Sequence, residues 1–462
     1  MPVRLAVALL PIAAAILAIA VGRRPAWQAG LLGLVLAAAA TPALVGATTA
    51  TATATATLAT GLAAGVQAAV PPVLVVLLGV AFYQALDDAG ALAGLAGTLV
   101  PGDRPAAATL ALVCGVAPLL ESATGFGVGV IVVAPMFLVL GQPPRRAAIL
   151  AMLGQNSVVW GALANGTVVG ARLAGLAPEQ LAARCAALNL LPLLVLGGVA
   201  LVVAGGRPLL VAGWRRLVLV AAVLAAGLSL ASRFLGPEVA ALVAAPPALI
   251  TAVWPLPPTA PGARSRLLPA VAPYLPLVGG VLAARALLPA PGQAYAAPVG
   301  LIIAVAAVRG RRASGRHVVS ALARGWPAAA ATGAFLVLAQ LLKGSGALAV
   351  LTEALSAWGA SYVWAVAPLA ALGGYLTGSN LASNSLFMPL HVGNAARLGL
   401  DPLRIASIQN EVAATLTLAS PIRIALGSAV VRLRGDEFSV TRVVLPAAVA
   451  AATLAALVGL AL

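Results

Sequence analysis

Charged residues are scarce in this chain of 462 residues: Asp, Glu, Lys and Arg together make up 8%, whereas an ordinary soluble domain carries about 25%. Hydrophobic residues make up 62%, and the mean hydropathy is +1.07. No soluble fold can hide that much apolar surface, which excludes a soluble enzyme, a nucleic-acid-binding domain and a disordered chain. The composition predicts an all-α polytopic membrane protein, in which each crossing takes about 20 apolar residues.

Residues that build metal and redox sites are also rare. The two cysteines, Cys114 and Cys185, both lie in apolar segments, so no disulfide framework is expected. The sequence contains no His-Glu-x-x-His, Gly-x-Ser-x-Gly, Walker or Cys-x-x-Cys motif. We therefore expect no metal, no cofactor and no catalytic nucleophile.

The net charge of +16 comes from arginines in short clusters between apolar runs. This spacing is typical of cytoplasmic loops under the positive-inside rule, and it does not form the continuous basic patch of a nucleic-acid-binding protein. The clusters lie at 23–24, 145–146, 207–216, 264–266, 309–316 and 432–442.

Twelve apolar runs predict membrane crossings, divided between an N-terminal half (1–255) and a C-terminal half (256–462). The Thr-Ala alternation from Thr48 to Thr57 is interpreted as an exposed connection. The predicted crossings are 3–21, 27–46, 66–86, 147–165, 183–205, 214–232, 239–255, 268–288, 295–308, 318–342, 405–431 and 442–462.

Two further stretches, 106–140 and 360–396, are too long and too interrupted for one crossing. If all arginine clusters are cytoplasmic, each stretch must enter and leave the membrane on one side. The sequence thus predicts two re-entrant hairpins of opposite orientation, with broken-helix motifs near 121–129 and 377–385. A proline and arginine then lead to a Gln-Asn pair after both stretches, which favours the inverted repeat found in many secondary transporters.

Glu121 is the sharpest feature of the first break. A carboxylate in hydrocarbon is costly, so it is expected to face a cavity or a partner, where it could take up and release a proton. The glycines that follow would let backbone amides approach an anion. The alternative is that Glu121 only caps a broken helix. Candidate ligand-binding residues around it are Ser122, Thr124, Gly125, Phe126 and Gly127.

The second break is rich in hydroxyls and amides, which can bond both the carboxylate and the hydroxyl of a small hydroxy acid. Unwound backbone at membrane depth is tolerated where it lines a cavity or is buried in protein. The alternative is packing between helices by small polar residues. The candidate residues are Thr377, Gly378, Ser379, Asn380, Ser383 and Asn384.

The remaining candidates lie on the helices that follow the breaks. Gln155, Asn156, Gln409 and Asn410 could contact substrate or brace the hairpins equally well. Arg423 could offer its planar guanidinium to a substrate carboxylate or could neutralise Glu411. His391 is more readily interpreted as a structural residue than as a proton relay.

At these breaks the chain resembles the bacterial L-lactate permease family. Leu120 to Gly127 is similar to the family's first glycine-rich signature, and Tyr375 to Phe387 is similar to its second. Arg233 to Glu238 matches a third conserved stretch in the same order. The chain departs from the family at Asn380, where the family has Asp, and near Arg423, where the family's lysine is missing.

The resemblance implies a plasma-membrane carrier that imports L-lactate, and often glycolate, together with protons. Its partners would be a small anionic substrate, protons and the lipid bilayer. Glu121, as an isolated acid in an apolar stretch, is the candidate proton site on the grounds given above. The alternative within transport is a sodium- or proton-coupled carrier of another anion, such as a dicarboxylate. A membrane-embedded enzyme is a weaker alternative, because the eleven acidic residues are scattered and most lie in loops. A passive channel is a second weaker alternative.

Overall fold

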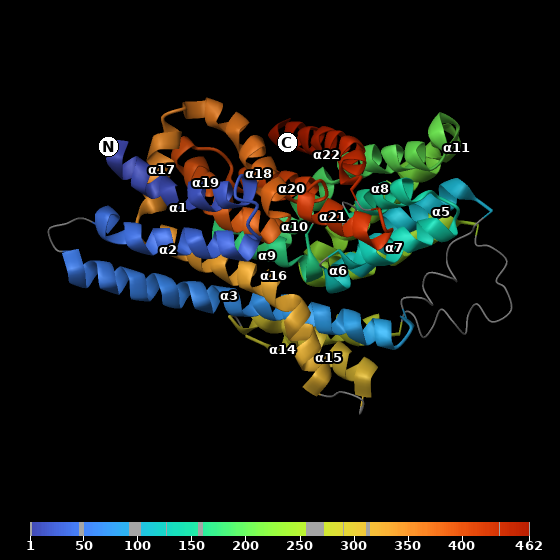
Figure 1. Ribbon diagram of the computed structural model, residues 1–462, viewed down its shortest axis with the longest axis horizontal. Helices are drawn as coiled ribbons and strands as arrows, with labels where there is room; N and C mark the ends of the chain where they lie inside the picture. The colour runs from blue at the N-terminus through green and yellow to red at the C-terminus, as the bar shows by residue number, and fades with distance from the viewer. Residues whose placement is uncertain are drawn as a thin grey trace.

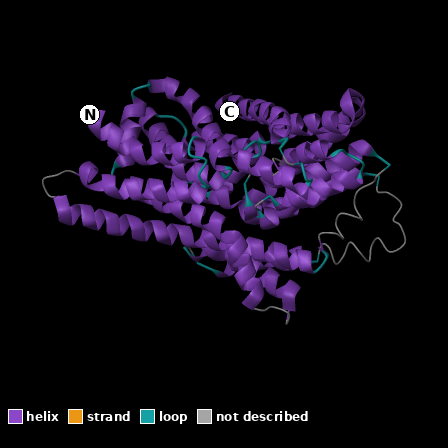
Figure 2. Ribbon diagram, in the orientation of Figure 1, coloured by secondary structure: helices purple, strands orange, loops and turns teal. Residues whose placement is uncertain are grey.

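The computed structural model describes residues 2–45, 50–91, 103–125, 127–155, 160–255, 272–289, 291–310, 315–433 and 435–461. Within these residues every regular element is a helix (Figures 1 and 2). Ten of the described helical segments are long and apolar enough to cross a membrane. The chain is therefore an all-helical, multi-pass membrane protein.

In the N-terminal half, three long helices precede a run of short segments, and two longer helices follow it. They are α1 (Pro2–Ala20), α2 (Ala26–Val45), α3 (Ala50–Asp88), α5 (Pro105–Ala111), η1 (Leu112–Val116), α6 (Ala117–Thr124), α7 (Val128–Val139), α8 (Pro144–Gly154), η3 (Ala162–Ala164), α9 (Asn165–Ala174), α10 (Pro178–Leu188), α11 (Leu190–Phe234) and α12 (Pro237–Val253).

The C-terminal half also combines long helices with short helical segments. Its helices are α14 (Tyr274–Leu287), η4 (Gly292–Tyr295), α15 (Ala296–Arg309), α16 (Gly315–Gly344), α17 (Ala347–Ser356), η6 (Gly359–Tyr362), α18 (Val363–Thr377), α19 (Asn380–Leu398), α20 (Pro402–Thr417), α21 (Pro421–Val430) and α22 (Glu437–Ala461).

Several predicted crossings, including 147–165 and 405–431, are not single uninterrupted helices, and this part of the prediction is wrong. In the run 147–165, α8 ends at Gly154 and a new helix starts at Asn165. In the run 405–431, α20 ends at Thr417 and α21 starts at Pro421, where proline cannot supply a backbone N–H to the preceding helix. Hydropathy alone missed both interruptions because it is averaged over a window in which apolar residues predominate, as in the segment Pro402–Val430.

The interpretation of Thr48 to Thr57 as an exposed connection is also wrong for the described residues 50–57, which form the first turns of α3. Alanine is the strongest helix former, and threonine can bond back to the preceding turn, as the Thr60 hydroxyl does to the carbonyl of Ala56. Along its length α3 packs against α16 of the other half (Figure 1).

The predicted crossing 183–205 begins in α10 and continues from Leu190 as the first arm of the kinked element α11, and the predicted crossing 214–232 is the second arm. The kink lies at Gly205 and Gly206, and Gly206 has a φ of 73°, a conformation that favours glycine.

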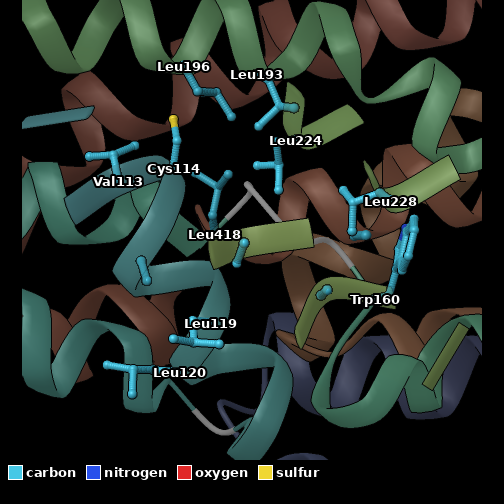
Figure 3. Packing of buried hydrophobic residues seen from close by; sticks show 14 of the residues in the cluster. Val113, Cys114, Leu119, Leu120, Trp160, Leu193, Leu196, Leu224, Leu228 and Leu418 are labelled. Carbon is cyan, nitrogen blue, oxygen red and sulfur yellow. The ribbon is translucent and has the colours of Figure 1, made fainter. Parts of the chain in front are cut away.

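The largest of three apolar clusters among the described residues joins the two halves. Leu418, from the gap between α20 and α21, lies among leucines of α11 and near the π-helical turn η1 of the first half (Figure 3). The labelled core residues are Val113, Cys114, Leu119, Leu120, Trp160, Leu193, Leu196, Leu224, Leu228 and Leu418. The described residues Trp160, Leu163 and Leu418 at the interruptions are therefore packed in the apolar interior.

Candidate functional site

The first break separates α6 from α7. Gly125 and Gly127 have φ values of 71° and 77°, which glycine adopts without steric cost. Glu121, in the last turn of α6, is 3% exposed. Its carboxylate accepts hydrogen bonds from the backbone N–H groups of Gly127 (3.2 Å) and Gly129 (3.3 Å), so the acid is anchored to the N-terminus of α7.

The second break separates α18 from α19. Gly378 has a φ of 62°, and Ser379 caps α19 by accepting a hydrogen bond from the N–H of Ala382. The Thr377 hydroxyl donates to the carbonyl of Gly373 at 2.7 Å and accepts from the N–H of Ser379 at 3.2 Å. These local bonds fix the polar turn in one conformation.

Arg423, in the first turn of α21, connects the two breaks. Its Nε donates to the carbonyl of Gly378 (3.0 Å), and its Nη1 donates to Oε1 of Gln155 (2.8 Å). The same Nη1 lies 3.5 Å from a carboxylate oxygen of Glu121. The interpretation that Arg423 neutralises Glu411 is therefore wrong, because Arg423 forms its ion pair with Glu121.

A cavity of about 450 Å³ lies where the interrupted helices meet. Its wall includes residues from both breaks, from the described residues between α8 and α9, and from the end of α20 and the start of α21. The sequence-predicted residues that line it are Glu121, Gly125, Gly127, Gln155, Thr377, Gly378, Ser379, Asn380 and Arg423.

The other predicted residues lie behind this wall or outside the described chain. Ser122 and Thr124 bond back to carbonyls of their own helix. Phe126 and Asn156 fall outside the described residues. Ser383, Asn384, Gln409 and Asn410 are fully buried and do not line the cavity.

These last four side chains form a network of amides that braces α19 against α20 and α9. Oδ1 of Asn410 accepts from Asn384 (2.8 Å), from Asn380 (3.0 Å) and from the hydroxyl of Thr167 (3.3 Å). Gln409 donates to the Ser383 hydroxyl at 3.2 Å. Because Asn380 also lines the cavity, the network connects the cavity wall to three helices.

The comparison with protein families covers almost the whole chain. A family model described as L-lactate permease matches residues 5–256 and 280–462. The chain belongs to the L-lactate permease family. It is therefore a transporter and not an enzyme. Both breaks of this L-lactate permease family member lie within the matched residues.

The fold of this L-lactate permease family member is also similar to a solved structure. The YdaH transporter of Alcanivorax borkumensis, described as having an unusual topology, aligns with a TM-score of 0.51 and 16% identity, over 94% of this chain and 96% of that one. At this identity the similarity concerns the fold alone. No match was found among curated proteins.

Several residues that line the cavity of this L-lactate permease family member were not predicted from the sequence, notably Trp160, Asn165, Gly166 and Thr417. Three of them lie at the interruption between α8 and α9, which was interpreted as part of a single span. The Asn-Gly pair at 165–166 was the available signal, because such pairs mark turns. Leu163 and Ala164 have positive φ values of 45° and 52°, so the backbone is strained next to the cavity.

Proposed function

We propose that this chain is a secondary active transporter that imports a small 2-hydroxymonocarboxylate, L-lactate or glycolate, across the plasma membrane by proton symport. The observation that carries the proposal is the position of Arg423, which contacts both breaks and a buried acid at the wall of one cavity. A guanidinium presents a planar fork that matches a carboxylate.

The backbone around the cavity also favours an anion. The first turns of α9, α19 and α21 contribute residues to its wall. Helix N-termini carry unpaired N–H groups and the positive end of the helix dipole. Asn165, Ser379 and Thr417 add amide and hydroxyl groups, which could recognise the hydroxyl of a 2-hydroxy acid.

The order of elements supports an inverted repeat with two re-entrant hairpins. In the first half the pair α6 and α7 is followed by the interrupted pair α8 and α9. In the second half α18 and α19 are followed by the interrupted pair α20 and α21. Substrate sites of inverted-repeat transporters form where such discontinuous helices meet. The two hairpins would enter the membrane from opposite sides.

The direct test uses the purified full chain in proteoliposomes. Radiolabelled L-lactate should accumulate when the outside is acidic, and unlabelled glycolate should compete. Replacement of sodium by choline should leave uptake unchanged. Uptake that requires sodium, or that responds to succinate and not to lactate, would refute this assignment of substrate and coupling ion.

A further inference from the structure

We propose that Glu121 occupies, in the substrate-free site, the position on Arg423 that the substrate carboxylate takes, so that proton uptake and anion binding are one exchange. This inference rests on the proposed function, since it treats the cavity as the transport site. It specifies how the coupling works and which charge class of substrate the cavity accepts.

The contacts of Arg423 separate its anchors from its ion pair. The carbonyl of Gly378 and the amide of Gln155 hold the guanidinium at 3.0 and 2.8 Å. The distance of 3.5 Å to Glu121 is longer than the 2.7–2.9 Å of a strong charge-assisted hydrogen bond. The ion pair can therefore be lost without displacing Arg423, because two neutral acceptors keep the guanidinium in place.

The two charged side chains also differ in their access to the cavity. The Arg423 side chain is 22% exposed, whereas the Glu121 side chain is 4% exposed. Nη2 of Arg423 has no hydrogen-bond partner among the described residues. An anion that enters the cavity thus meets the guanidinium first, and the carboxylate of Glu121 lies behind it.

Charge counting gives the stoichiometry. Arg423 and Glu121 are the two charged side chains among the described residues of the cavity wall. When a proton from solvent bonds to a carboxylate oxygen of Glu121, the acid becomes neutral and Arg423 is left with a positive charge. One monocarboxylate restores neutrality. The exchange therefore moves one proton with one anion and no net charge.

The same count disfavours dicarboxylates. A second carboxylate would enter a cavity whose described wall offers no second cation. An uncompensated charge in a poorly solvated site is costly. The structure thus favours monocarboxylates over dicarboxylates for this cavity.

Other charged groups lie at the far ends of the elements packed against α6, and none of them bonds to Glu121 in the described chain. Arg285 pairs with Glu238 at the start of α12, and Arg309 pairs with Asp88 at the end of α3. The remaining charged groups on these packed elements are Asp87 at the end of α3 and Arg145 and Arg146 in the first turn of α8.

The experiment measures L-lactate binding to the purified full chain in detergent as a function of pH. For the wild type, affinity should rise about tenfold for each unit of decreasing pH while free Glu121 is ionised, since one proton is bound with each anion. Proton uptake in weak buffer should equal one per lactate. In proteoliposomes, pH-driven uptake should generate no membrane potential.

Glu121→Gln places a neutral side chain behind Arg423 permanently. This variant should bind lactate with an affinity independent of pH, and it should exchange lactate across the membrane without pH-driven accumulation. Glu411→Gln is the matched control, because Glu411 is a buried acid outside the cavity wall, and its pH dependence should equal that of the wild type.

Two results would overturn the exchange. The first is unchanged pH dependence in Glu121→Gln. The second is loss of lactate binding in Glu121→Gln with an unaltered melting temperature, which would make Glu121 a direct ligand of the substrate. Binding of another monocarboxylate, such as pyruvate, with one proton and without any binding of lactate would refute the proposed substrate. It would still support the exchange of Glu121 for a substrate carboxylate on Arg423. Wild-type protein that binds no monocarboxylate refutes both.

Discussion

The guanidinium of Arg423 donates a 2.8 Å hydrogen bond to the side-chain carbonyl of Gln155, which lies in the opposite half of the chain. Gln155 stands at the end of α8, where the polypeptide leaves the helix beside the cavity. Its amide nitrogen lies 3.5 Å from the carboxylate of Glu121. One neutral side chain therefore orients both charged groups of the site.

Removal of this amide should loosen Arg423. A hydrogen bond to a charged group contributes about 1.5–3 kcal/mol, so Gln155→Ala is expected to raise the KM for lactate uptake about tenfold or more with little loss of folded protein. Gln142→Ala is the matched control, since Gln142 bonds to the carbonyl of Ala204 away from the cavity. Equal KM values for the two variants would show that Gln155 does not position the arginine.

The shape of the Arg423 side chain should matter as well as its charge. Arg423→Lys retains the positive charge, but an ammonium group lacks the planar fork that reaches Gly378, Gln155 and a carboxylate together. We expect lactate affinity to fall at least tenfold in equilibrium binding, while proton coupling of the residual uptake persists. Full affinity in the lysine variant would contradict a forked contact.

The Asn410 network should act on stability rather than on transport chemistry. Asn410→Ala leaves Asn380, Asn384 and Thr167 without their shared acceptor. Each unsatisfied buried donor costs about 1–3 kcal/mol, so the melting temperature of the purified protein should fall by several degrees. Gln293→Ala, at an exposed position, should leave it unchanged. An Asn410→Ala protein as stable as the wild type would show that water replaces the network.

The close approach of α18 to α20 should depend on a glycine. A Cβ on Gly374 would clash with the carbonyl oxygen of Ala413, whereas a Cβ on Gly279 meets nothing within 4 Å. Overpacking of a dense core costs about 1–3 kcal/mol or more. Gly374→Ala should therefore reduce the yield of monodisperse protein, and Gly279→Ala should preserve it. Similar size-exclusion profiles would mean that the two helices separate easily.

The stability of the fold should not depend on the carboxyl group of Glu411. It is fully buried, and both carboxyl oxygens have no hydrogen-bond partner among the described residues. An unpaired charge there would be costly, so Glu411→Gln should match or exceed the melting temperature of the wild type. A clear loss of stability would reveal a partner for this carboxyl in another conformation of the transporter.

The sequence alone determined the class of the protein, because hydropathy, charge clusters and glycine breaks are local properties. It located Glu121 and the polar turn at Thr377 to Asn380, and both line the cavity. The sequence motifs at these residues predicted membership of the L-lactate permease family. The family model, which matches residues 5–256 and 280–462, confirms it. Hydropathy could not reveal the interruptions between α8 and α9 and between α20 and α21, since it averages over windows in which apolar residues predominate.

Only the tertiary structure decided how the polar side chains are paired. Gln155, Asn410 and Arg423 each had two open roles in the sequence, and each role depends on which residues of the other half come within hydrogen-bond distance. Arg423 contacts Glu121 rather than Glu411 because α21 is a new helix that starts at Pro421 beside the second break. Such long-range pairings follow from the packing of helices distant in sequence, and no local pattern encodes them.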